Sequence, residues 1–196
     1  SGLHLEGRRL AEQLLACAGA APDRRALALY WLSNHQLRLG DLPATLETGA
    51  SALRLLERTP MAMLRSRLHC ALALACAQAS RYPDALNHAD QAVRTAELSG
   101  DTLARAWALN RLGTAHADLG DAAQGRSLLT ESLKLARELG DVELEFASLN
   151  NLGSHLNWRS IGRAEASESA PQLFAAALAT LREAHALALK LGNPHS

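Results

Sequence analysis

The side chains able to bind metals or to act as nucleophiles are eight histidines and three cysteines, scattered over 196 residues. Two histidines four residues apart on one helix would provide half of a metal site, and no pair has that spacing. Cys70 and Cys76 are six residues apart, so on a helix they face different directions. We therefore expect no metal site, and we expect the cysteines to be small, buried hydrophobic residues.

The sequence contains no arrangement typical of a catalytic site. No glycine loop can hold a phosphate, because each Gly-Asp pair ends one helix and starts another. No Ser–His–acid or Cys–His constellation stands out, and stacks of helix pairs seldom enclose a water-free pocket. We therefore expect a protein that binds other molecules, with neither catalysis nor a cofactor.

The composition favours helices and argues against several classes of protein. Hydrophobic residues make up 48% of the chain and are mostly Ala and Leu, which lose little freedom in a helix. The 20 basic and 20 acidic side chains cancel, whereas a nucleic-acid binder usually shows a basic excess. The longest apolar run, 68–79, is too short to span a membrane. An odd number of irregularly spaced cysteines favours a reducing, cytoplasmic location.

Recurrent turn residues divide the chain into helices. Glycine followed by Asp or Asn recurs at 40, 100, 120, 140 and 192, where glycine can end one helix and the next residue can cap another. The six prolines (22, 43, 60, 83, 171 and 194) fit the first turns of helices. These signals predict helices over 3–18, 22–38, 43–58, 60–79, 83–98, 101–118, 122–138, 141–158 and 172–190.

The chain repeats itself at an offset of forty residues. The segments 28–33, 68–73, 108–113 and 148–153 align, each ending in Leu followed by a small residue: Ser33, Ala73, Gly113 and Gly153. A small residue there allows the second helix of a pair to pack closely, against leucines such as Leu129 and Leu181. One pair cannot bury its apolar face alone but a stack can, which predicts an all-α, right-handed α-solenoid of antiparallel helix pairs with about nine helices.

These repeats resemble the tetratricopeptide (TPR) superfamily over residues 22 to about 192. The resemblance implies a single TPR-like domain over 1–196, with a half-repeat helix (3–18) and four repeats: 22–58, 60–98, 101–138 and 141–192. The period of forty exceeds the usual thirty-four. The aromatic residue expected three positions after the small one is replaced by Gln36, Cys76, His116 and Leu156. We expect the segment to belong to a longer protein.

The last repeat is longer than the others by twelve residues, near 159–170, a polar stretch rich in Ser and Ala. It is interpreted either as a tolerated loop insertion or helical extension, or as a docking loop.

Long repeats ending in LARELGD and restarting in SLNNLG resemble those of bacterial signalling proteins. There they accompany output domains such as diguanylate cyclases or LuxR-type DNA-binding domains. The resemblance implies a regulatory or sensor region that takes part in signal transduction by binding a protein or peptide. The alternative is a structural or dimerisation module acting through a terminal helix face, with Leu3, Leu10, Leu14 and Leu15 forming an uncovered stripe and producing a homodimer. Contact with nucleic acid or a membrane is not expected.

In such stacks the first helix of each pair lines a concave groove. Aromatic residues, Asn and Arg gather at the corresponding positions, and they suit peptide anchoring, backbone hydrogen bonding and carboxylate binding. The alternative is that these side chains bond between neighbouring helices. The candidate partner-binding residues are Tyr30, Trp31, Asn34, Arg38, Arg67, Trp107, Asn110, Arg111, Asn150, Asn151, Ser154 and Trp158, with Cys70, Thr114 and Asn157 at similar positions.

Overall fold

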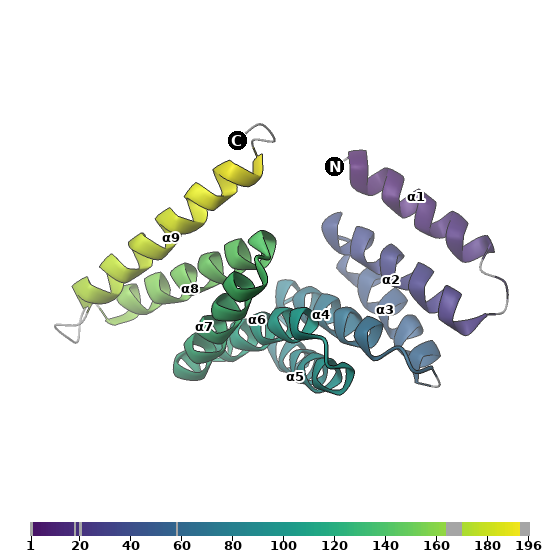
Figure 1. Cartoon of the computed structure of the whole chain (residues 1–196), viewed down its shortest axis with the longest axis horizontal. Helices are drawn as coiled ribbons and strands as arrows, with labels where there is room; N and C mark the ends of the chain where they lie inside the picture. Colours follow the sequence, from purple (N-terminus) through teal and green to yellow (C-terminus); the bar gives the residue numbers. More distant parts are fainter. Residues whose placement is uncertain (1, 18, 20, 58, 164–169, 193–196) are drawn as a thin grey trace. The chain divides into compact units, whose positions relative to one another are not determined.

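The computed structural model describes residues 2–17, 19, 21–57, 59–163 and 170–192, which form nine α-helices (Figure 1). Neighbours in the chain pack as sequential antiparallel pairs, among them α2–α3, α4–α5 and α8–α9. The predicted all-α class is therefore confirmed. The helices are α1 (Gly2–Cys17), α2 (Pro22–Arg38), α3 (Leu42–Leu56), α4 (Ala62–Gln78), α5 (Tyr82–Ser99), α6 (Thr102–Asp118), α7 (Ala122–Leu139), α8 (Val142–Arg163) and α9 (Ala170–Gly192).

The chain divides into two compact units, residues 1–111 and 112–196, and the division falls within α6. Each unit is described separately below. None of the helices in the described part of the chain is long and apolar enough to cross a membrane.

The joints between helices use the predicted turn chemistry. Gly40, Gly100, Gly120 and Gly140 all have positive φ, between 65° and 92°, a conformation that glycine adopts without steric cost. The following aspartate then caps the next helix: Asp121 Oδ1 accepts the Gln124 N–H at 3.2 Å, and Asp41, Asp101 and Asp141 cap in the same way. Gly192 differs, because it is the last residue of α9.

Two predicted helix boundaries need correction. Pro60 precedes α4, which begins at Ala62 after the N-cap residue Met61. The eighth helix continues past the predicted end at 158 to Arg163, so the first part of the expected insertion is a helical extension. The rest of that insertion, 164–169, and Pro194 lie outside the described residues.

Leucine and alanine build the core of the 1–111 unit. Leu56, Leu68 and Leu72 are at most 1% exposed and pack with Ala26 and Ala52, joining α2, α3 and α4. Burying each leucine contributes roughly 1.5–3 kcal/mol. The fully buried Ser66 on α4 is satisfied across helices, because its Oγ donates to the Ala92 carbonyl oxygen on α5 at 2.9 Å.

Close helix approach organises the 112–196 unit. A Cβ added at Gly113 would lie 2.9 Å from the Gly125 carbonyl oxygen and 2.9 Å from Leu129 Cγ. The α6 backbone at Gly113 therefore packs directly against backbone and side-chain atoms of α7. A Cβ at Gly153 would likewise lie 2.5 Å from Leu181 Cγ, between α8 and α9. The small residues after the repeated leucines therefore face the leucines predicted for the second helices.

Candidate functional site

In the 1–111 unit, polar and aromatic side chains gather on the first helices of successive pairs. α2 packs directly against α4, and the α6 residues up to Arg111 belong to the same unit. We call this set the first-helix surface and define it by Tyr30, Trp31, Arg67, Cys70, Trp107 and Arg111. Trp31 and Arg67 are exposed and the other four are half-buried.

The α2 part of this surface is aromatic. The rings of Tyr30 and Trp31 meet edge to face with centroids 5.2 Å apart, and Trp31 is 46% exposed. An exposed indole on a rigid helix offers contact area to a partner at little conformational cost. Asn34 is half-buried, and its amide donates to the Tyr30 carbonyl oxygen at 2.8 Å, a bond within its own helix.

Two arginines complete the surface from α4 and α6. Arg67 on α4 acts on the Tyr30 hydroxyl on α2 and opposes the rise of its pKa. The Arg111 guanidinium lies 5.6 Å from the centroid of the Trp107 ring, within the range of a cation–π interaction. Both guanidiniums act electrostatically on the Cys70 thiol and favour its thiolate form.

The titratable groups on this surface are poor catalysts at neutral pH. Burial raises the pKa of the Cys70 thiol to about 11, although Arg111 and Arg67 favour the thiolate. Because the thiolate is the nucleophilic form, Cys70 is inert at pH 7. Burial also raises the pKa of the Tyr30 hydroxyl against the opposing effect of Arg67. The surface can therefore bind through hydrogen bonds, charge and aromatic contact.

Two other candidates from this unit differ from each other in exposure. Arg38 is exposed at the end of α2. Asn110 is fully buried, so its amide faces the interior and the first-helix surface is defined without it. The forty-residue alignment placed Asn110 and Asn150 together, yet Asn150 in the other unit is exposed.

The predicted partner-binding residues of the 112–196 unit differ in their burial and contacts. Asn150 and Ser154 are exposed on α8, whereas the half-buried Asn151 donates to Thr114 Oγ1 on α6 at 3.3 Å. Asn151 thus makes the bond between helices that the sequence left as an alternative. Trp158 and Asn157 lie where the structure does not describe side chains.

Sequence reasoning missed two pairs of titratable side chains. His69 on α4 and His88 on α5 place their Nδ1 atoms 3.1 Å apart. Asp118 on α6 and His155 on α8 interact electrostatically, and desolvation raises the pKa of Asp118 and lowers that of His155. Both pairs link different helices, so a search for four-residue spacing within one helix could not find them.

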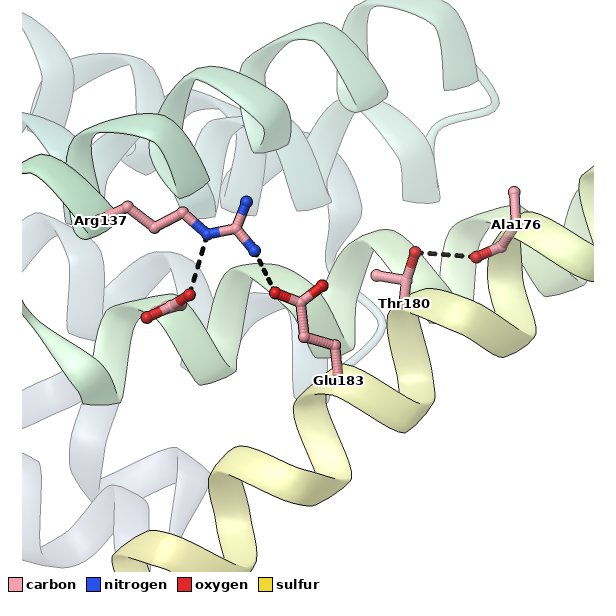
Figure 2. A network of polar contacts seen from close by, with 5 residues as sticks. Arg137, Ala176, Thr180 and Glu183 are labelled. Carbon is pink, nitrogen blue, oxygen red and sulfur yellow. Dashed lines mark hydrogen bonds and ion pairs between the residues drawn. The ribbon is translucent and has the colours of Figure 1, made fainter.

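An ion-pair network of the 112–196 unit joins three helices and has a structural role. Arg137 on α7 donates to Glu145 on α8 at 2.9 Å and to Glu183 on α9 (Figure 2). Three helices are thereby joined at one guanidinium. Because Arg137 is 47% exposed, solvent screens these charges and the network stabilises the fold only modestly.

The cysteines and histidines form no larger cluster where the chain is described. No group of three or more His, Cys, Asp or Glu residues there could hold a metal ion. Cys76 is buried as expected, whereas Cys70 is half-buried and Cys17 is exposed at the end of α1.

The helix pairs, the glycine–aspartate joints and the surface across first helices define a TPR-like helical repeat module. The crystal structure of BtubC (BKLC) from P. vanneervenii has the same kind of fold, with a TM-score of 0.66 and 17% identity. That match covers 100% of this chain and 74% of the other. At this identity the similarity shows the fold alone. No protein-family model matches the chain, and no curated protein does.

Proposed function

We propose that this chain is a non-catalytic module that binds a protein or peptide on its first-helix surface. The observation that carries the proposal is the exposed Trp31, whose ring centroid lies 5.2 Å from that of Tyr30, together with Arg111 at 5.6 Å from the Trp107 ring in the same unit. Elsewhere in this unit the first helices bury mainly Ala and Leu. Large aromatic and arginine side chains at an accessible surface are the residue types that dominate binding energy in protein interfaces.

The test is a comparison of variants in a pull-down from the native source. Trp31→Ala should reduce recovery of the partner and leave thermal unfolding nearly unchanged, because the indole is exposed in the free protein. Loss of a central aromatic anchor typically costs about 2 kcal/mol, roughly thirtyfold in affinity. Leu98→Ala is the matched control, since Leu98 is 84% exposed but lies on the second helix α5. Equal recovery with both variants would contradict the proposal.

We further propose that binding regulates an output domain in the cytoplasm of a bacterium. This step rests on the resemblance of the repeats to those of bacterial signalling proteins, with diguanylate cyclase or LuxR-type DNA-binding domains as the expected outputs. Sequencing the coding region on both sides of this segment tests it. A neighbouring domain of an unrelated class would contradict it.

Self-association through α1 is a second candidate function. Leu3, Leu10 and Leu14 are 75%, 54% and 57% exposed and fall on one side of the helix, while Leu15 is half-buried. An uncovered apolar stripe at the end of a helix stack favours association. Sedimentation of the parent and of Leu10→Glu at high concentration tests this candidate. Association of both proteins to the same extent would contradict it.

A further inference from the structure

A second exposed apolar stripe lies on α9, in addition to the α1 stripe of Leu3, Leu10 and Leu14. The α9 stripe consists of Phe174, Leu178 and Leu189, which are 54%, 38% and 61% exposed. α1 packs against α2 and α9 packs against α8, and the stripes lie on other sides of these two helices than the buried alanines. Each of the two units therefore offers one uncovered apolar helix face.

The two stripes have the same length. Leu3 and Leu14 are eleven residues apart, and so are Leu178 and Leu189. Eleven residues make about three helical turns and span about 16 Å, so the two leucines of each pair lie on one side of their helix. If the helices are placed side by side and run in the same direction, Leu3 comes opposite Leu178 and Leu14 comes opposite Leu189.

The charges beside the two stripes are opposite. The exposed Glu6 follows Leu3 by one turn of α1, and the exposed Arg182 follows Leu178 by one turn of α9. In the arrangement that aligns the leucines, Glu6 therefore comes opposite Arg182. The other described acidic residue of α9, Glu183, bonds to Arg137 on α7, away from the stripe.

Pairing either stripe with its own copy lacks this charge complementarity. Two α1 stripes in contact would place two Glu6 carboxylates in one interface, and two α9 stripes would place two Arg182 guanidiniums in one interface. Like charges that meet across an interface oppose association, whereas opposite charges favour it and fix the register. The charges therefore favour α1 against α9 over either symmetric pair.

We propose that copies of this chain associate through unlike surfaces, with the α1 stripe of one copy packed against the α9 stripe of the next. This inference rests on the self-association through α1 that is the second candidate function above, and it names the surface that α1 meets. A contact between two different surfaces leaves one stripe free on each partner, so further copies can add. The assembly should therefore grow with concentration beyond a dimer.

The test uses two variants of the full 196-residue chain, each with one stripe blocked. Leu14→Glu puts a charge into the α1 stripe and Leu189→Glu puts one into the α9 stripe. Both positions are more than half exposed, so thermal unfolding should match that of the parent. In sedimentation velocity the parent should form oligomers that grow with concentration, and each variant alone should be a monomer.

Mixing the two variants gives the decisive result. Each variant supplies the stripe that the other lacks, so an equimolar mixture should form a one-to-one complex and nothing larger. Leu98→Glu is the matched control, because Leu98 is exposed on α5 outside both stripes, and it should associate like the parent.

A charge exchange within this mixture tests the register. Glu6→Arg in the partner with the intact α1 stripe should weaken the complex about fivefold, and so should Arg182→Glu in the partner with the intact α9 stripe. Both changes together should restore the affinity to within about twofold of the original complex. Losses that simply add would overturn the contact between Glu6 and Arg182.

The outcomes separate this inference from the candidate function on which it rests. If Leu189→Glu alone still forms a dimer and does not bind Leu14→Glu, α1 pairs with α1, which overturns the unlike contact and leaves self-association through α1 intact. A parent chain that stays monomeric at high concentration would overturn both, because a second copy would then not be the occupant of either stripe.

Discussion

The Nδ1 atoms of His69 and His88 lie 3.1 Å apart, so one ring must donate a proton and the other must accept it. Such a bond requires at least one neutral imidazole. Desolvation lowers the pKa of His69 to about 4, with further lowering by His88 and Arg65. Desolvation also lowers the pKa of His88, and there Asp84 opposes and Arg81 reinforces the shift.

We predict that stability falls as the solution is acidified from about pH 6.5 toward the pKa of about 4 that His69 has in the folded chain. The folded pKa of His69 lies below the unfolded value of 6.5, so the stabilisation is complete above about pH 6.5 and is lost as pH falls toward 4. The loss is on the order of 3 kcal/mol. Urea unfolding from pH 7.5 to 4.5 measures it. His88→Gln should flatten the dependence, whereas His185→Gln, an exposed position on α9, should leave it unchanged.

Gly113→Ala should destabilise the fold by about 1–3 kcal/mol. The added Cβ would meet the Gly125 carbonyl oxygen at 2.9 Å and the Leu129 nitrogen at 3.0 Å, and backbone atoms cannot yield as a flexible side chain can. This cost exceeds the roughly 0.5–1 kcal/mol that alanine normally gains over glycine inside a helix. Gly2→Ala, with nothing within 4 Å, is the control for thermal unfolding. Equal melting of parent and Gly113→Ala would show that the helices can separate without cost.

Asn110→Ala and Asn150→Ala should differ although the two positions align. Asn110 is fully buried, so truncation of its amide should cost about 1–3 kcal/mol. Asn150 is exposed, so truncation should change stability by less than about 0.5 kcal/mol. Chemical denaturation of both variants makes the comparison. A large loss for Asn150→Ala would mean that its amide supports the fold.

Arg137→Met should destabilise the 112–196 unit by at most about 1 kcal/mol, and the difference should shrink in 0.5 M salt. The substitution keeps much of the aliphatic stem and removes the bonds to Glu145 and Glu183. Lys134→Met is the control, because Lys134 pairs only with Glu138 on its own helix at 3.8 Å among the contacts described. Melting at low and high salt gives the result. A salt-independent loss would indicate packing as the cause.

Local signals made the helices predictable, since a glycine, an aspartate and an apolar period act within a few residues. The turn at Ser80 carries no such signal: a serine takes φ 58° where Gly40 and Gly120 stand in the neighbouring repeats. Contacts across helices were harder to predict. Asn110 and Asn150 share a repeat position, but the depth of each side chain depends on the helices packed around it.

The aspartate that follows the glycine between two helices forms hydrogen bonds with both of them. The Asp121 N–H bonds back to the His116 carbonyl at the end of α6, and its carboxylate caps α7. Fraying of one helix therefore uncaps the next, so in hydrogen exchange both sides of the joint should open as one cooperative unit. At the joint between α4 and α5, Arg81 bonds back to Cys76 but makes no side-chain cap, so fraying of α4 does not uncap α5 in this way.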